Sequence, residues 1–446
     1  MKAIVVPGVT DLNKGDQALV WESHRMAMDT KLFDEVSILS LGDTQEEYEL
    51  LCSQSKDKGF KIIKNILKHP RRGKHPKNSV IGEGFLYLLF QIFNALSDLF
   101  SRSLLLKVCS NKFLTNLLFS KETSSTVNEF RNTDVIFVKG GGFIHAHGEK
   151  SAPYVMWFFL FYLKLGLKLN KKVVFLPNSY GPFDGLTVKY QIKKTLKKLD
   201  LVLARENISS DRLGELLNKK IQVLPDLGFY LKSSDKEIGA EILKEHGFSN
   251  HDKIVGITIR PWRFPGKNNP EELYEKYINS VKDLALHVHQ KGYKVAFFNQ
   301  SLGPNAHEDD RNAIRYLMSK FDENEASKFV WVNENFNCED LKSIYSNLYF
   351  FIGTRFHSVI FSMTALVPSI AIGYGGNKAK GIMSDFQLDE FVIQIEDVTT
   401  NDLVSRFDKG ISQYDFIKSR LEEKIVLLEQ KRKETIELIK STVCPK

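Results

Sequence analysis

Short apolar runs alternate with helical segments along most of the chain, and this alternation constrains the fold more than any other feature. The runs are rich in Val, Ile, Leu and Phe, and they lie at 2–8, 36–41, 134–142, 171–179, 199–205, 221–226, 254–260, 293–300, 328–333, 349–357, 369–375 and 390–395. Continuous apolar character is typical of strands buried on both faces of a sheet. Strands that alternate with helices predict parallel sheets joined by crossover helices, so we expect an α/β fold.

The chain is too long for one ordinary core, since it has 446 residues. A polar stretch and a helix-like segment at 228–252 separate the apolar runs into two series. We therefore expect two doubly wound domains that face a cleft. They are predicted at 1–230, with a basic and helical insertion at about 55–130, and at 231–400, followed by a helical extension at 401–446.

Composition excludes several classes of function. The net charge of +8 suits anionic partners, or simply a solvated basic surface, and no basic-aromatic motif indicates nucleic-acid binding. The four cysteines lack CxxC spacing, which argues against a metal cluster or a disulfide framework and favours a reducing compartment. The N-terminus is too polar for a signal peptide, and no run of 18 uncharged apolar residues is present. We expect a cytoplasmic protein without a metal or a cofactor.

The insertion carries an unusual pair of segments. Residues 56–77 hold nine Lys or Arg against one Asp, and an apolar segment follows at 84–100, interrupted by Gln91, Asn94 and Asp98. Such a pair can lie on an anionic bilayer, which would place the protein at the inner face of the membrane. The alternative is a helical insertion packed on the first domain beside a solvated basic loop.

Polar residues gather where the predicted strands end. They include Asn13, Gly15 and Asp16, the run Gly140, Gly141 and Gly142, then Arg205, Arg260, Arg355 and His357, and finally the segment 374–380. Ligands of open parallel sheets bind at the carboxyl ends of the strands, so these residues predict a shared binding site.

Each of these elements has an ordinary alternative. The triple glycine can bring backbone N–H groups to an anion at a helix start, or it can form a tight turn. It matches no dinucleotide or Walker fingerprint. Asp16 can act on a ligand or cap the following helix, and Asn13 can be an ordinary loop residue. Arg355 and His357 form the sharper pair, because Arg binds carboxylate or phosphate and His exchanges protons near neutral pH.

Seven segments in this order, NKGDQAL, KGGGF, NSYGP, AREN with DRLGELL, LPDLGF, TRFHSVIFS and YGGNKAKGI, resemble the polysaccharide pyruvyl transferase family over residues 2 to about 390. The resemblance implies two Rossmann-like domains similar to the GT-B glycosyltransferases. It implies transfer of a pyruvyl group from phosphoenolpyruvate to two hydroxyls of a sugar, which forms a cyclic ketal during assembly of capsule, exopolysaccharide or cell-wall glycan.

The same resemblance suggests roles for individual residues. Arg355 and His357 match the donor-binding pair, Arg205 matches an arginine that meets the donor, and Lys378 matches a late lysine, although Lys380 is an alternative. Gly15 and Asp16 lie in the matching N-terminal loop.

We hypothesise that Arg205, Arg260, Arg355 and Lys378 bind phosphoenolpyruvate, that His357 donates a proton to it, and that Asp16 is the base for the acceptor hydroxyl. Two loops are expected to contact the acceptor or a phosphate. One carries Asn13 and Gly15, and the other consists of Gly140–Gly142. The acceptor sugar can be nucleotide-linked, lipid-linked or polymeric. The alternative function is a GT-B glycosyltransferase that uses a nucleotide sugar.

Overall fold

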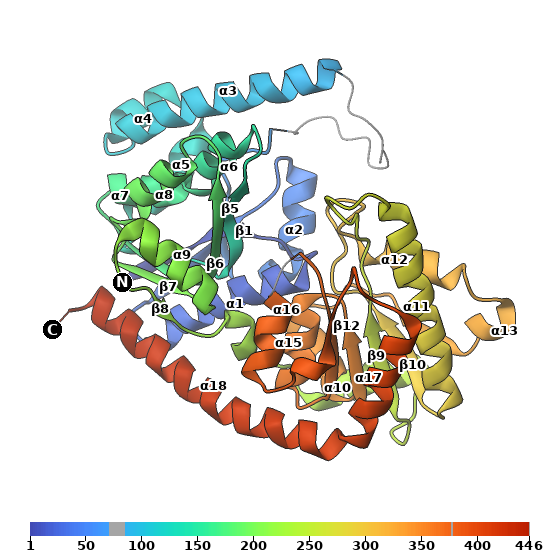
Figure 1. Cartoon of the computed structure of the whole chain (residues 1–446). Coiled ribbons are helices and arrows are strands. Elements are labelled where there is room, and N and C mark those ends of the chain that lie inside the picture. The colour runs from blue at the N-terminus through green and yellow to red at the C-terminus, as the bar shows by residue number, and fades with distance from the viewer. Residues whose placement is uncertain (71–84, 376–377, 446) are drawn as a thin grey trace. The chain divides into compact units, whose positions relative to one another are not determined.

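The chain divides into two compact units in a computed structural model that describes residues 1–70, 85–375 and 378–445, with only the backbone described for 85–87 and 378 (Figure 1). Unit 1 comprises Met1–Asp11, Leu19–Tyr230 and Gln430–Lys446, and unit 2 comprises Leu12–Ala18 and Leu231–Glu429. Each unit is built on one parallel sheet, which confirms the predicted α/β fold class.

The sheet of unit 1 has the strand order β3-β2-β1-β4-β6-β7-β8, and β5 pairs with β6 beyond the end of β4. The strands are β1 (Lys2–Val9), β2 (Glu35–Ser40), β3 (Lys61–Ile63), β4 (Val135–Val138), β5 (Gly141–His147), β6 (Lys172–Asp184), β7 (Leu201–Ala204) and β8 (Gln222–Val223). The helices are α1 (Lys14–Asp29), α2 (Gln45–Asp57), α3 (Phe85–Val108), α4 (Lys112–Leu118), α5 (Lys121–Arg131), α6 (Ala152–Phe159), α7 (Phe161–Lys168), α8 (Val188–Leu196) and α9 (Asn207–Leu217). β4 is apolar and buried throughout, and β6 is so from Val173 to Leu176, as the sequence predicts.

The sheet of unit 2 has the order β11-β10-β9-β12-β13-β14, and every pairing is parallel. The strands are β9 (Ile254–Thr258), β10 (Lys294–Phe298), β11 (Phe329–Val332), β12 (Phe350–Gly353), β13 (Ser369–Gly373) and β14 (Val392–Gln394). The helices are α10 (Lys236–Glu245), α11 (Pro270–Gln290), α12 (Asp310–Met318), α13 (Glu323–Ala326), α14 (Cys338–Ser346), α15 (Phe356–Thr364), α16 (Lys378–Asp385), α17 (Thr400–Ser412) and α18 (Tyr414–Val443). This strand order is that of a doubly wound nucleotide-binding fold. Figure 1 shows α11 and α12 on one side of the sheet and α15 and α16 on the other.

The division into units differs from the predicted boundaries at both ends of the chain. Residues Leu12–Ala18 fall within the predicted first domain but belong to unit 2, where Leu302 N–H donates to the Leu12 carbonyl at 2.8 Å. Gln430–Lys446 belong to unit 1, where the Lys172 ammonium donates to the Val443 carbonyl at 2.7 Å. The predicted extension 401–446 is therefore divided between the two units.

The insertion is also shorter than the predicted 55–130. β3 pairs with β2 and is part of the sheet, and α5 leads directly into β4. The additional helices are α3 and α4, and the basic residues from 71 to 77 lie outside the described residues. Within the described part of the chain, no helix is long and apolar enough to cross a membrane.

Candidate functional site

The carboxyl ends of β9 and β12 meet at the point where the strand order of unit 2 reverses. Crossover segments leave these two neighbouring strands toward opposite sides of the sheet, which opens a crevice at the strand ends. Arg260 follows β9, and Arg355 follows β12 as the residue that precedes α15. The fold therefore places two of the predicted donor-binding arginines at the ordinary ligand position of such a sheet.

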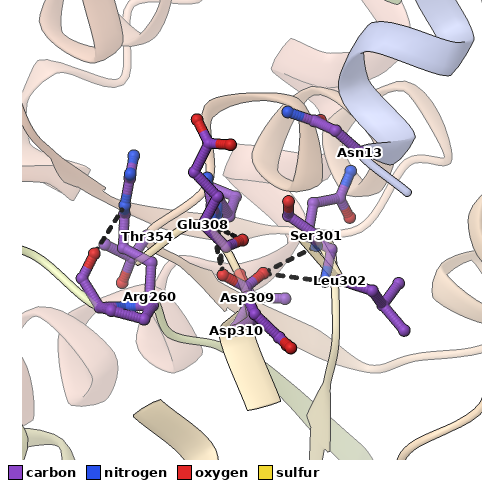
Figure 2. Close-up of polar contacts among 12 residues, drawn as sticks. Asn13, Arg260, Ser301, Leu302, Glu308, Asp309, Asp310 and Thr354 are labelled. Atoms are coloured by element: carbon purple, nitrogen blue, oxygen red, sulfur yellow. Dashed lines mark hydrogen bonds and ion pairs between the residues drawn. The ribbon is translucent and has the colours of Figure 1, made fainter. Parts of the chain in front are cut away.

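Arg355 is held by a buried ion pair. Its Nε and Nη2 donate to Asp310 Oδ1 at 2.9 and 2.6 Å, and Nη2 also donates to the Glu308 carbonyl at 2.7 Å. The other carboxylate oxygen accepts from the N–H groups of Gln300 and Ser301 at 3.0 and 2.9 Å, as Figure 2 shows for the Ser301 segment. Burial lowers the pKa of Arg355, but the Asp310 carboxylate outweighs that effect and raises the pKa above its ordinary value. Burial raises the pKa of Asp310, and Arg355 opposes that effect. The hydrogen bonds hold both side chains in place.

Arg260 is a buried cation of a different kind. Its side chain lies 4.1 Å from the Tyr374 ring centroid and 4.9 Å from that of Trp262, and its Nε donates to the Pro261 carbonyl at 3.3 Å. Only 8% of the residue is exposed, yet no carboxylate of the described residues forms an ion pair with it. Burial lowers the pKa of Arg260 and the charge of Arg355 adds to this effect, whereas Tyr374 and the Asp310 carboxylate act in the opposite direction. The two strand ends thus carry two guanidinium groups, and of these only Arg355 forms an ion pair with a described carboxylate.

Tyr277 of α11 connects the two strand ends. Its hydroxyl accepts from the Arg260 N–H at 3.4 Å and forms a 2.8 Å hydrogen bond with the Thr354 hydroxyl. The Thr354 N–H in turn donates to the Thr258 carbonyl at 3.0 Å. This buried hydroxyl fixes the backbone from which both arginines project.

The N-terminal loop joins the same cluster. The Asn13 side chain caps α1, because its Oδ1 accepts from the N–H groups of Gly15 and Asp16 at 3.1 and 3.3 Å, and its backbone pairs with Ser301 (Figure 2). Asn13, which the sequence left as a possible loop residue, is therefore a capping residue of α1. Asp16 is half-buried in the first turn of α1.

Gly15 lies directly against His357. A Cβ at Gly15 would overlap the imidazole Nδ1, so only glycine leaves room for this ring. Lys14 and Gln17 hold the loop from both sides: the Lys14 ammonium donates to Asn335 Oδ1 at 2.5 Å, and Gln17 Oε1 accepts from the Cys338 N–H at the start of α14 at 2.8 Å. Unit 2 thus brings Asn13, Gly15 and Asp16 together with the Arg355–His357 element.

Arg205 and the triple glycine, by contrast, belong to unit 1. Arg205 follows β7, where it forms a 2.5 Å ion pair with the buried Asp226 and also contacts Glu206 and Ser179. Its guanidinium is already matched by carboxylates.

The triple glycine does not begin a helix, and that part of the prediction is wrong. Gly141 opens β5, and α6 begins only at Ala152. The glycines are explained by packing: a Cβ at Gly140 would lie 2.8 Å from the Pro177 carbonyl, and Gly141 has a φ of 142°. The following histidines, 145 and 147, are exposed on β5.

The late lysines lie at the start of α16 in unit 2. Lys378 is its first residue, but its side chain lies outside the described residues. Lys380 is described and exposed. No group of three His, Cys, Asp or Glu residues that could hold a metal ion occurs in the described chain.

Residues 13–376 match the model of the polysaccharide pyruvyl transferase family. The chain belongs to this family. A curated relative is the amylovoran biosynthesis protein AmsJ of Erwinia amylovora, which is 20% identical over 315 residues that cover 69% of this chain and 73% of AmsJ. The predicted family is confirmed, and with it a transferase of polysaccharide biosynthesis.

Solved structures confirm the GT-B-like fold of this pyruvyl transferase family member. The glycosyltransferase UGT73P12 of Glycyrrhiza uralensis superposes with a TM-score of 0.56 at 11% identity, covering 99% of this chain and 96% of its own. UGT89C1 of Arabidopsis thaliana gives 0.56 at 11% identity, covering 99% of both chains. UDP-GlcNAc 2-epimerase of Methanocaldococcus jannaschii gives 0.53 at 11% identity, covering 92% of both chains. At these identities the likeness concerns the fold alone.

Three residues at the carboxyl ends of β9 and β12 were not predicted from the sequence: Asp310, Tyr277 and Trp262. Asp310 stands in a polar run before a helix, where Asp is an ordinary first-turn residue. Tyr277 lies in the middle of a long helix. Trp262 alone gave a signal, because it follows Arg260 by two residues just beyond a strand end.

Proposed function

We propose that this protein transfers the pyruvyl group of phosphoenolpyruvate to two hydroxyls of a sugar in a surface glycan or its precursor, forming a cyclic ketal and releasing phosphate. One observation carries the proposal: two buried guanidinium groups lie at the switch point of unit 2, and among the described residues only Arg355 has a carboxylate as ion-pair partner. An uncompensated buried cation is costly unless an anion joins it. Phosphoenolpyruvate offers a carboxylate and a phosphate on one small molecule.

In this proposal Arg260 binds one anionic group of the donor through its two Nη groups. Arg355 contributes Nη1, which donates to no described residue, while Asp310 keeps the rest of the fork in place. Stacking on Tyr374 and Trp262 fixes the plane of Arg260. Fixed donors of this kind stabilise charge without reorganising during the reaction.

The proton transfers are assigned to His357 and Asp16. His357 protonates C3 of the enol, which becomes the methyl group, while the first sugar hydroxyl bonds to C2 and gives its proton to Asp16. The C2–O bond to phosphate then breaks, and the bonding electrons leave with the phosphate. The second hydroxyl attacks C2, and its proton leaves with the phosphate. Gly15 lets the His357 ring approach the N-terminal loop that carries Asp16.

Further contacts are proposed on the family resemblance alone. Arg205 and Lys378 are additional donor ligands, and Gly140–Gly142 contact the acceptor. Arg205 must share its guanidinium with Asp226 in that case. The reaction is placed in the cytoplasm, in keeping with the four free cysteines.

Calorimetric titration tests the donor. We expect saturable binding of phosphoenolpyruvate that weakens on the order of 10- to 100-fold in Arg260→Gln, since a charge-assisted contact is lost. Arg315→Gln, an exposed arginine on α12, is the matched control and should bind as the wild type does. UDP- and CMP-sugars are titrated in parallel. Binding of a nucleotide sugar with no response to phosphoenolpyruvate would replace the proposal by a GT-B glycosyltransferase.

A further inference from the structure

Helix α3 turns its apolar face outward and its polar face inward. Leu89, Phe93, Leu96 and Phe100 follow one another at spacings of four, three and four residues, so they share one face of the helix. They are 45%, 69%, 61% and 75% exposed. A helix on the surface of a water-soluble protein normally has the reverse arrangement.

The opposite face of α3 is the buried one, although it carries polar side chains. Asn94 and Asp98 are 7% and 9% exposed, and Leu105 is fully buried on the same face. The Asn94 side chain donates to the Pro70 carbonyl at 3.0 Å. The helix is therefore anchored to unit 1 through this polar face, where it also contacts α4 and α7 (Figure 1).

Helix α4 extends the apolar surface. The exposed large apolar side chains of the two helices are Leu88, Leu89, Phe90, Ile92, Phe93, Leu96, Phe100, Phe113, Leu117 and Leu118. We call this set the α3–α4 patch. It holds half of all exposed large apolar side chains in the described residues. A concentration of this kind marks an interaction surface, because isolated apolar residues would be scattered.

The exposed charges of α3 and α4 themselves have one sign. Lys107 and Lys112 are exposed, and Lys107 follows Leu89 by 18 residues, which is five helical turns and hence the same face. At the start of α5, the exposed Lys121 is followed by the exposed Glu122. Between residues 88 and 121 the sole carboxylate of the sequence, Asp98, is buried on the other side. The occupant of the patch is therefore apolar in its interior and anionic at its surface.

We propose that the α3–α4 patch docks this protein on an anionic lipid bilayer, with α3 lying in the plane of the interface. The apolar side chains enter the boundary between headgroups and acyl chains, and the lysines meet anionic headgroups. A second copy of the chain fits less well, since a two-fold interface through this face would set lysines against lysines. Combined with the proposed function, on which this last step rests, docking brings the site to a sugar acceptor carried by a membrane lipid.

Vesicle co-sedimentation without substrate tests the docking independently of catalysis. Wild-type protein should sediment with phosphatidylcholine/phosphatidylglycerol vesicles, more weakly with pure phosphatidylcholine, and less at high salt. Phe93→Glu/Phe100→Glu should lower binding at least about tenfold. The two rings that would enter the bilayer are replaced by carboxylates, which the anionic headgroups repel. Lys107→Glu/Lys112→Glu should lower binding to the anionic vesicles in particular.

Leu186→Glu is the matched control, since Leu186 is 81% exposed in unit 1 but outside the patch. It should bind vesicles as the wild type does. Unchanged far-UV circular dichroism and cooperative thermal unfolding show that the variants are folded, whether or not phosphoenolpyruvate binds. Absence of wild-type binding to anionic vesicles, or equal binding by Phe93→Glu/Phe100→Glu, overturns the inference. So does a dimer in sedimentation velocity that needs Phe93 and Phe100 while vesicles are not bound.

Discussion

Arg260 and Arg355 differ at the residue scale in what balances their buried charge. Arg355 is matched by Asp310, whereas no described carboxylate pairs with Arg260. Arg260→Gln should therefore leave the ligand-free stability unchanged or raise it by about 1 kcal/mol, because an unmatched cation is removed. Arg355→Gln should lower the stability by about 3–5 kcal/mol, because it leaves the buried Asp310 carboxyl group without its ion-pair partner. Urea denaturation of the ligand-free variants measures both.

The control for this pair of substitutions is Asp310→Asn in the Arg355→Gln background. Removing the second charge should recover a large part of the loss. If Arg260→Gln proved as destabilising as Arg355→Gln, Arg260 would be part of the structural framework, and its assignment to the donor would fail.

Gly15 is expected to act through His357. Its backbone is helical, so Gly15→Ala introduces no conformational strain, but the added Cβ overlaps the imidazole. We expect kcat to fall on the order of 10- to 100-fold while phosphoenolpyruvate affinity changes little, since the arginines are untouched. A double-mutant cycle with His357→Ala measures the coupling. If Gly15→Ala lowered kcat by the same factor in the His357→Ala background, Gly15 would act by a route other than His357.

The residues of the site could be predicted where chemistry and strand position coincide. Arg260, Arg355 and His357 are polar residues that follow apolar strands closely, and a parallel sheet brings such positions together. Asp310 and Tyr277 could not be found in this way, because their roles depend on side-chain contacts across the fold. The capping role of Asn13 was not predicted for the same reason: capping depends on where the helix begins.

At the scale of elements, α10 and α14 approach so closely that only glycine fits at the crossing. A Cβ at Gly239 would overlap the Ser343 carbonyl and lie 2.6 Å from the Ile344 nitrogen. Gly239→Ala should therefore lower the stability by about 1–3 kcal/mol, although alanine favours helix by about 1 kcal/mol. Thermal denaturation measures this loss. Glu241→Ala, at an exposed position on the same helix, is the control and should change the stability little. A more stable Gly239→Ala protein would contradict the close approach.

The strands were the most predictable elements, because burial on both faces leaves a continuous apolar run in the sequence. Two strands were missed for clear reasons. β3 has three residues inside a basic segment, and β5 begins within the glycine run that follows β4. For the segment that forms α3, the sequence left two alternatives open, contact with a bilayer and packing on the first domain. An apolar stripe alone does not indicate which of these covers it, and only the structure shows that the apolar face is exposed.

At the scale of the whole molecule, the chain passes between its two units more often than the sequence suggests. Leu12–Ala18 lie near the start of the chain but belong to unit 2, and Gln430–Lys446 lie at its end but belong to unit 1. Local patterns such as apolar periodicity specify helices and strands but carry no information on which sheet a segment joins. Hydrogen bonds such as that from Leu302 to Leu12 decide it, and they appear only in three dimensions.

Acid should destabilise unit 1 through His24. Burial lowers the pKa of His24 from 6.5 to about 4, a backbone hydrogen bond to Val36 opposes this shift, and the ring packs 4.5 Å from that of Phe60. The unfolded chain binds a proton below pH 6.5, whereas the folded protein resists it until about pH 4. Stability is therefore present above pH 6.5 and is lost as the pH falls through this window. We expect a loss of about 2 kcal/mol between pH 7 and pH 5.

Pulse proteolysis in urea at pH 7 and pH 5, with fragments assigned to unit 1 by mass spectrometry, measures this loss. His24→Gln cannot take up the proton, so the part of the pH dependence due to His24 should disappear in this variant. His251→Gln, in unit 2, is the matched control and should retain the wild-type dependence for unit 1. An unchanged pH dependence in His24→Gln would mean that other groups carry the acid sensitivity of unit 1.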